Sequence, residues 1–474
     1  MVFSSFVFLC IFLPVVLGLH TCIKNTAVRN ALLIIASLLF YGYGEPKFII
    51  LLVISSFMNY VFGLLVAKNK SKAIVAIATI LNLGLLVVFK YLGLFTTSIN
   101  ALVPGGNLVP VIKIALPIGI SFYTFQALSY VIDVYRGDTE VQKNFAKLLL
   151  YISFFPQLIA GPIVKYHDID VQLTDRDPSF IDIRNGIFRF CVGLSKKVLI
   201  SNSLAFVADS LFNNTPLLEI SFASALLAGF TYMMQIYFDF SGYSDMAIGL
   251  GRMFGFHFLE NFNHPYISDS IQEFWRRWHI SLSSYFREYL YIPLGGNRKG
   301  ARRTYINRYI VFAATGIWHG ANWTFLVWGL FHGTFLVLES SGLLPIKKCK
   351  IKAVRCAYTL LLVMIGFIMF RADNITQGLY YIKALFGFGS ASGLGFSYAM
   401  QFVNFYYVII YILAIVGCTE LPIKLYKKLM KFETVEDMPV TSEIISMVLC
   451  VVAILLSFMS LASASYNPFI YFRF

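Results

Sequence analysis

The stretch EIISMVLCVVAILLSFMSLA, residues 443–462, is apolar except for a glutamate at its start and three serines, and it carries no charge after that glutamate. An α-helix rises about 1.5 Å per residue, so a helix of this length crosses the roughly 30 Å hydrocarbon core of a bilayer. Similar stretches recur along all 474 residues, of which 58% are hydrophobic and 13% charged, with a mean hydropathy of +0.72. Soluble domains have an apolar content of about 45–50%. The chain is therefore predicted to be an all-α, polytopic membrane protein.

The candidate spans differ in regularity. Residues 116–119 and 155–162 carry proline and glycine inside apolar segments, which indicates re-entrant or tilted helices rather than full crossings. We expect about 11 transmembrane helices, together with re-entrant and interfacial ones. The candidates are residues 2–19, 30–43, 47–66, 73–97, 115–134, 145–162, 185–211, 220–250, 304–318, 321–340, 354–371, 400–418 and 443–462.

The 38 lysines and arginines outnumber the 24 acidic residues, and the net charge is +14. In a membrane protein this excess is expected in cytoplasmic loops. The basic clusters at 68–72, 136–143 and 424–431 are therefore assigned to the cytoplasm, which leaves both termini extracytoplasmic in the cell membrane. No basic run is long enough to follow a phosphate backbone, so no nucleic-acid partner is expected.

His319 is the strongest catalytic candidate among the seven histidines. Apolar spans flank it on both sides, and an ionisable side chain at membrane depth is by default a functional hypothesis. The alternative is a histidine that only hydrogen-bonds a neighbouring helix. Gly316 and Gly320 favour the functional interpretation, because glycine permits close approach of backbone or ligand. An imidazole can also take a proton from a hydroxyl and return it to a leaving group.

The segment 274–290 is dense in aromatic and basic side chains. Read as one helix, it has an aromatic face and a basic face. The aromatic face comprises Trp275, His279, Leu282 and Phe286, and the basic face comprises Arg276, Ser283 and Arg287. We predict a continuous helix at the cytoplasmic interface, with its basic side toward water.

Other nucleophile and metal patterns are weak. Ser241 is the best candidate serine nucleophile, but it lacks a strand–turn–helix context and is interpreted as structural. Asp239 and Asp245, on either side of it, are candidate partners for the basic segment. The seven cysteines have no CxxC spacing, so neither a metal site nor a disulfide framework is predicted.

Five motifs together resemble the membrane-bound O-acyltransferase family, in the branch of the alginate and peptidoglycan O-acetyltransferase membrane subunits and the related teichoic-acid D-alanyl transfer proteins. They lie at residues 117–126, 154–163, 235–251, 274–296 and 316–322. The resemblance implies a single membrane-embedded domain over residues 1–474, built as a ring of helices with a cytoplasmic funnel. It also implies a catalytic core at about residues 110–340 and an extracytoplasmic tail at 463–474.

The resemblance implies roles for particular residues. His319 corresponds to the buried histidine of the family and His279 to a second, more polar one. The remaining substrate-binding candidates are Arg276, Arg277, Arg298, Lys299, Trp318 and Asn322. The four basic side chains suit a phosphate-bearing pantetheine arm, although positive-inside topology alone also accounts for them.

The final residues resemble the Phe-Ile-Tyr-x-x-Phe motif of this branch. By that resemblance the hydroxyl of Tyr471 accepts the acyl group at the extracytoplasmic mouth of a tunnel. A phenol with a pKa of about 10 is both activatable and a good leaving group for the next transfer. The alternative is an aromatic belt at headgroup level, which composition alone would explain.

The predicted function is transfer of an acyl group, preferentially acetyl, from a cytoplasmic thioester to hydroxyls of an extracytoplasmic polysaccharide or envelope polymer. One alternative is D-alanyl or other acyl transfer from a carrier protein. Another is a transporter or flippase, which also has broken helices, although the two related halves typical of transporters are not seen. No bound cofactor or metal is expected, and acetyl-CoA or another thioester serves as co-substrate. The expected partners are the membrane, the donor, an SGNH-type extracytoplasmic transferase and the polysaccharide.

Overall fold

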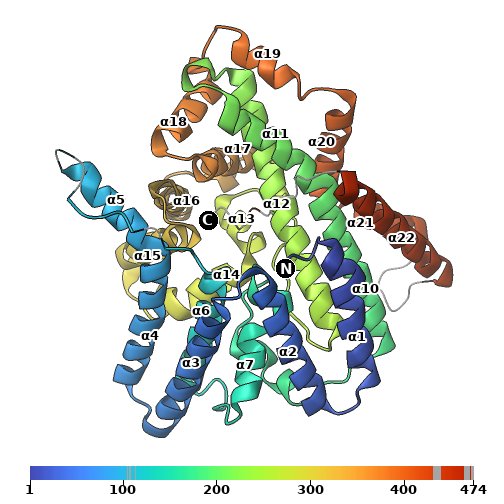
Figure 1. Ribbon diagram of the computed structural model, residues 1–474. Helices are drawn as coiled ribbons and strands as arrows, with labels where there is room; N and C mark the ends of the chain where they lie inside the picture. The colour runs from blue at the N-terminus through green and yellow to red at the C-terminus, as the bar shows by residue number, and fades with distance from the viewer. Residues whose placement is uncertain (104, 106–107, 113, 431–438, 464–469, 471–474) are drawn as a thin grey trace. The chain divides into compact units, whose positions relative to one another are not determined.

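The computed structural model describes residues 1–474 except 104, 106–107, 113, 431–438, 464–469 and 471–474. Every regular element within the described residues is helical (Figure 1), which confirms the all-α prediction. The chain forms two compact units. The first comprises residues 1–190 and 244–260, and the second comprises residues 191–243 and 261–474.

Six helical segments among the described residues are long and apolar enough to cross a membrane. They are Thr26–Gly44, Ile49–Asn69, Lys72–Leu102, Phe180–Asn214, Lys352–Arg371 and Val440–Ser463. The pair Leu394–Met400 and Phe405–Gly417, bent by 78°, makes up to seven if it forms one span. The prediction of a multi-pass membrane protein agrees with these segments, whereas the count of about 11 crossings stays a prediction.

The first unit is built mainly from the N-terminal helices. Its α-helices are α1 (Leu13–Cys22), α2 (Thr26–Gly44), α3 (Ile49–Asn69), α4 (Lys72–Leu86), α5 (Leu92–Leu102), α6 (Ile120–Arg136), α7 (Phe145–Ser153), α8 (Phe155–Leu158) and α9 (Tyr166–Ile169). Shorter 3-10 and π-helical segments are η1 (Phe8–Phe12), η2 (Val87–Tyr91) and η3 (Val171–Leu173). Helices α10 (Phe180–Ser195) and α12 (Phe222–Met253) contribute to both units.

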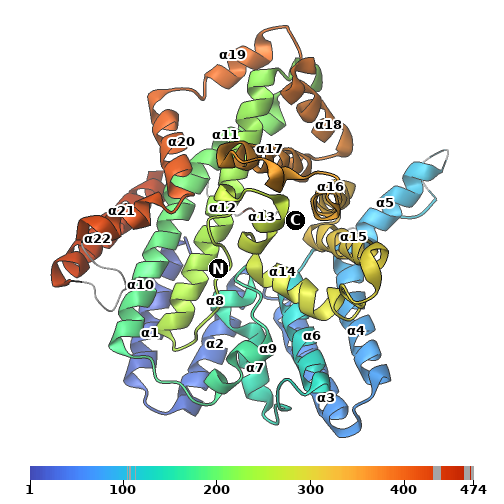
Figure 2. The same cartoon turned by 180° about the vertical axis from the view of Figure 1, so that it is seen from behind.

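Helix α6 is the centre of the first unit and packs on α3 and α4, which run side by side in both views (Figures 1 and 2). It begins after Gly119, whose φ of 79° is unfavourable for other residues, and a Cβ there would lie 2.6 Å from the Leu158 carbonyl oxygen. The predicted span at 145–162 is divided into α7 and α8, which are nine and four residues long. The proline and glycine in this segment therefore mark a real interruption, as expected.

The second unit carries the remaining helices. They are α11 (Asn202–Asn214), α13 (Ile271–Arg277), α14 (Ile280–Phe286), α15 (Gly300–His319), α16 (Trp323–Ser341), α17 (Lys352–Arg371), α18 (Ile375–Lys383), α19 (Leu394–Met400), α20 (Phe405–Gly417), α21 (Leu421–Met430) and α22 (Val440–Ser463). Shorter segments are η4 (Lys196–Ser201), η5 (Leu217–Glu219), η6 (Pro265–Ile267), η7 (Arg287–Tyr291), η8 (Ile346–Lys348) and η9 (Ala384–Phe388).

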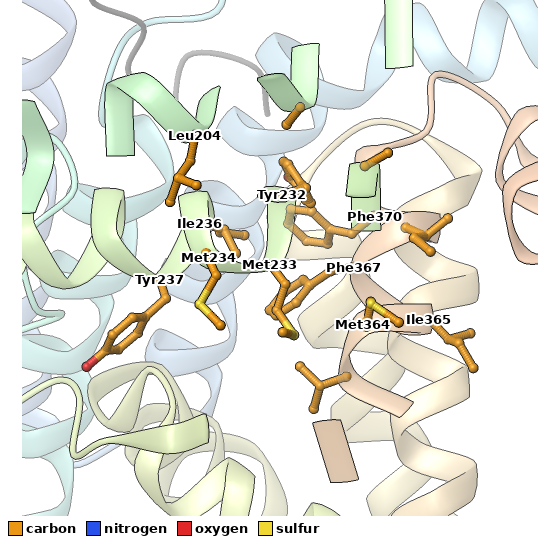
Figure 3. Close-up of a cluster of buried hydrophobic side chains, with 14 of the residues drawn as sticks. Leu204, Tyr232, Met233, Met234, Ile236, Tyr237, Met364, Ile365, Phe367 and Phe370 are labelled. Carbon is orange, nitrogen blue, oxygen red and sulfur yellow. The ribbon is translucent and has the colours of Figure 1, made fainter. Parts of the chain in front are cut away.

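The core of the second unit lies where α11, α12 and α17 meet (Figure 3). Its labelled side chains are Leu204, Tyr232, Met233, Met234, Ile236, Tyr237, Met364, Ile365, Phe367 and Phe370. Helices α15 and α16 form a tightly packed pair, and α16 packs in turn on α13 and α17. The site lies at the C-terminal ends of α15 and α17, beside the middle of α12.

Candidate active site

The segment 274–290 is not the continuous helix that its spacing predicts. Helix α13 ends at Arg277 and α14 begins at Ile280, because His279 adopts a left-handed conformation with φ 44° and ψ 56°. Asn261 supplies the hydrogen bonds that the break removes, since its carbonyl oxygen accepts the Ile280 N–H at 2.9 Å. Its side-chain Oδ1 accepts the Ser281 N–H at 3.2 Å. A left-handed non-glycine residue is uncommon, and such residues gather at functional sites.

The same contacts define the protonation of His279, whose ring is fully buried. Its Nδ1 lies 3.2 Å from Asn261 Oδ1. A backbone N–H only donates, so the atom that receives Ser281 N–H is the amide oxygen, and His279 Nδ1 carries the proton toward it. The lone pair is then on Nε2, which has no hydrogen-bond partner among the described residues. This nitrogen is available to take a proton from a substrate.

Burial also keeps this ring neutral. It lowers the pKa of His279, which lies outside the six long apolar segments, to about 3. A neutral imidazole with its proton on Nδ1 cannot donate through Nε2. The ring is therefore neutral at rest with its lone pair on Nε2, and it could polarise a carbonyl only after protonation.

His319 is the last residue of α15, which ends because Gly320 continues in an extended conformation. Its ring is 6% exposed and lies among aromatic rings, with centroids 5.1 Å from Trp328 and 5.2 Å from Phe370. The ring centroids of His319 and His279 are 6.4 Å apart. A helix C-terminus carries partial negative charge, which favours an imidazolium formed there by proton transfer. The structure thus brings the two predicted histidines together.

A small cavity of about 20 Å³ adjoins His319. The rest of its lining is apolar and comes from α12, α16, α17, the α13–α14 break and the C-terminal segment: Ile236, Phe240, Trp278, Trp328, Phe367, Phe370 and Ile470. Ile236, Phe367 and Phe370 belong to the core cluster of Figure 3. Such a cavity has room for roughly one water molecule. It is a preformed, largely apolar setting in which electrostatic interactions are strong.

A larger cavity of about 290 Å³ lies between α13, α14, α15 and η7. Arginines and aromatic side chains both contribute to its lining: Gln272, Trp275, Arg276, Leu282, Ser283, Phe286, Arg287, Tyr291, Asn297, Arg308, Val311, Phe312, Thr315 and Leu336. Both predicted faces of the segment 274–290 therefore reach one cavity. The ring centroids of Trp275 and Trp328 are 5.7 Å apart, and Trp328 lines the His319 cavity.

The predicted basic residues lie in different places. Arg276 lines the large cavity, whereas Arg277 forms an ion pair with Glu273 at 2.8 Å. Arg298 and Lys299 are exposed and are not part of the lining. Arg287, which the helical spacing places on the basic face with Arg276, and Arg308, which no sequence pattern singled out, do line it.

A third cavity, of about 370 Å³, lies at the ends of α15 and α17. Asn322 lines it and caps α16 by accepting the Thr324 N–H at 3.1 Å. Arg371, which the sequence analysis missed, also lines it and pairs with Asp209 at 2.6 Å. Phe370 lines both this cavity and that of His319.

Other sequence candidates take different positions. Trp318 lies beside His279, with the two ring centroids 6.1 Å apart. Asp239 and Asp245 do not pair with the basic segment as expected: Asp239 pairs with Lys197 at 2.5 Å, and Asp245 with Arg189 at 2.6 Å. Tyr471 lies outside the described residues.

Comparison with known proteins bears on this site. A profile of the membrane-bound O-acyltransferase family matches residues 140–382, which include both histidines. The chain is 43% identical over 396 residues to a probable alginate O-acetylase AlgI of Azotobacter vinelandii, covering 82% of this chain and 79% of that protein. It is 36% identical over 430 residues to a peptidoglycan O-acetyltransferase of Helicobacter pylori, covering 83% and 81%.

A more distant relative is a teichoic acid D-alanyltransferase of Bacillus subtilis, 30% identical over 231 residues that cover 46% of this chain and 58% of that protein. The profile match and the coverage of the O-acetylating relatives agree with the site geometry and with the apolar helices. The chain is therefore an O-acyltransferase and a multi-pass member of the membrane-bound O-acyltransferase family.

Proposed function

We propose that this protein transfers an acyl group, preferentially acetyl, from a cytoplasmic thioester to hydroxyls of an extracytoplasmic polysaccharide or cell-envelope polymer. The observation that carries the proposal is the pair of buried imidazoles, 6.4 Å apart, of which His319 lines a small cavity rich in aromatic side chains. Relatives named for O-acetylation of alginate and peptidoglycan support acetyl as the group and a polymer as the acceptor.

The donor side is assigned to the cavity of about 290 Å³ between α13, α14, α15 and η7. Arg276, Arg287 and Arg308 offer charged, multiply donating groups to the phosphates of a pantetheine arm. The aromatic side chains between them suit the apolar part of that arm. Thr315 of this lining lies one helical turn before His319 on α15, so an arm that enters the cavity points toward the imidazoles.

The reaction moves one proton from the acceptor hydroxyl to the departing sulfur. The acceptor hydroxyl gives its proton to a histidine nitrogen, its oxygen forms an ester bond with the acyl carbon, the carbon–sulfur bond breaks, and the thiolate takes up the proton. His319 is proposed to activate the hydroxyl, as the family resemblance implies. His279, with its free Nε2 lone pair, is proposed to position the thioester and to relay the proton.

The acceptor side is assigned to the third cavity, which shares Phe370 with the His319 cavity. We propose that Tyr471 takes the acyl group there and passes it to an SGNH-type transferase outside the membrane. This arrangement has both termini extracytoplasmic and the chain in the plasma membrane. With both ends on one side the number of crossings is even, so the predicted count of about 11 becomes about 10 or 12, around a cytoplasmic funnel.

A second candidate is D-alanyl transfer from a carrier protein, favoured by the 30% identity to a teichoic acid D-alanyltransferase. Purified protein in proteoliposomes, supplied with labelled acetyl-CoA or with a D-alanyl carrier protein, separates the two. We expect free thiol from acetyl-CoA and an acetyl adduct on the C-terminal peptide, absent in Tyr471→Phe. Turnover of the carrier alone would favour the second candidate. Movement of an unmodified solute without thiol release would indicate a transporter.

A further inference from the structure

Ile470 occupies an unexpected position. It is 3% exposed and lines the cavity that holds His319. Its backbone N–H donates to Asp239 Oδ2 at 2.9 Å, across a sequence separation of 231 residues. Asp239 lies on α12 between Ile236 and Phe240, which line the same cavity. Ile470 is therefore held at the site by a backbone hydrogen bond as well as by its apolar side chain.

The acceptor of that hydrogen bond is part of a buried ion pair. Lys197 Nζ lies 2.5 Å from Asp239 Oδ1, and the two side chains are 4% and 1% exposed. Ser201 Oγ donates to the same Oδ1 at 3.3 Å, so Oδ2 is left to accept the Ile470 N–H. Lys197 reaches Asp239 because η4 approaches α12 closely: a Cβ on Gly242 of α12 would lie 3.2 Å from the Lys197 backbone nitrogen.

A buried ion pair contributes little net stability by itself, because both charges lose their hydration. Removing both charges from water costs several kcal/mol per ion, and an apolar pair of similar volume is often as stable or more so. This pair also does something an apolar pair cannot do: it presents a charged acceptor to one backbone N–H. Hydrogen bonds to charged acceptors are roughly twice as strong as neutral ones.

The seated residue also limits the cavity. With Ile470 in place the space beside His319 is about 20 Å³, enough for roughly one water and too small for an acetyl group. An acetyl group therefore does not fit beside His319 while Ile470 is seated there.

We propose that Lys197 and Asp239 form a latch that seats Ile470 in the His319 cavity, and that they act as positioning residues for acyl transfer. The placement of Ile470 rests on its own contacts, and only its part in transfer rests on the proposed function. Lys197 fixes the carboxylate, and Asp239 holds the Ile470 backbone.

Two double variants test the latch. Lys197→Met/Asp239→Leu replaces the ion pair by apolar side chains of similar shape and removes the acceptor, without leaving an unpaired charge. Lys197→Met/Asp239→Asn removes both charges but keeps an amide oxygen for the Ile470 N–H. Both are made with Ile470→Cys in a background that lacks the seven native cysteines. A thermal unfolding temperature close to that of the parent shows that each variant folds.

The first readout is the rate at which a small maleimide labels Cys at position 470, measured without donor. We expect about a tenfold or greater increase in the Leu variant, from loss of a hydrogen bond to a charged group, and a much smaller increase in the Asn variant. Equal labelling of the parent and the Leu variant would overturn the latch, whatever the protein does to acetyl-CoA.

The second readout, in variants with Ile470 restored, is the acyl adduct on the C-terminal peptide together with thiol release. We expect the adduct to be lost in the Leu variant and partly rescued in the Asn variant. A normal adduct despite faster labelling would overturn the positioning role. The labelling pattern could hold while the parent protein transfers no acyl group from any thioester. That result would support the placement of Ile470 by Asp239 and refute the proposed function.

Discussion

The contact between α15 and α16 predicts a large effect of one methyl group near His319. A Cβ on Gly316 would overlap the Phe325 carbonyl oxygen and lie 3.2 Å from the Leu326 Cα. These are backbone atoms of α16, which cannot rotate aside. Normal carbon contacts are about 3.5–4.0 Å, so Gly316→Ala forces the two helices apart by roughly 1 Å. Overpacking of this kind costs about 1–3 kcal/mol of unfolding free energy.

The same displacement reaches the site, because His319 lies three residues farther along α15. A misplacement of about 1 Å at a catalytic group can cost roughly 100-fold in rate. We therefore expect Gly316→Ala to slow thiol release from acetyl-CoA by about this factor and to lower the thermal unfolding temperature in detergent. Gly320 was singled out together with Gly316 from the sequence, and a Cβ there would overlap the Phe325 ring.

Gly84→Ala is the matched control. Gly84 lies inside α4, and a Cβ there has no neighbour within 4 Å among the described atoms. Alanine in a helix interior is favoured over glycine by about 0.5–1 kcal/mol, so this variant should unfold no lower than wild type and keep its rate. If Gly316→Ala matched Gly84→Ala in both stability and rate, close backbone packing would not be what holds His319 in place.

Further predictions concern the donor cavity, pH and orientation. Arg276→Gln should raise the KM for acetyl-CoA several-fold with little change in kcat. Arg277→Gln should leave the KM unchanged, and equal effects of the two substitutions would refute the assignment of the donor cavity. The hydrogen bond to Asp133 raises the pKa of His167 above 6.5. The protonated His167 therefore stabilises the fold fully below pH 6.5, and this contribution is lost as the pH rises through the raised pKa. The difference in unfolding temperature between wild type and His167→Gln should therefore disappear on going from about pH 6 to about pH 8.5. A constant gap would contradict this linkage. Lys427→Cys should resist an impermeant thiol reagent added from outside, and rapid labelling would invert the proposed orientation.

The apolar stretches predicted the helical class because hydropathy reports directly on the solvent that surrounds a helix. They also predicted the interruption at 155–162, because proline and glycine act locally on the backbone. His319 could be singled out for the same local reason, since its apolar flanks and nearby glycines stand beside it in the sequence.

Features that depend on distant partners were missed. The break at His279 is stabilised by Asn261, 18 residues earlier, so helical spacing alone predicted a continuous helix. Arg371 looks like an ordinary charged end of an apolar span until its contact with Asp209, 162 residues away, is known. The bond between Ile470 and Asp239 leaves no trace in local composition, because a backbone N–H has no sequence signature.

The central claim is that two buried imidazoles carry the proton during acyl transfer. The most direct measurement is the rate of thiol release from labelled acetyl-CoA in proteoliposomes containing His319→Gln, His279→Gln or His257→Gln. His257, whose side chain is 59% exposed, serves as the control. Loss of a general acid–base group costs about 100-fold to 10,000-fold, so we expect losses in that range for the first two variants and a wild-type rate for the third. Wild-type rates in folded His319→Gln and His279→Gln would contradict the claim.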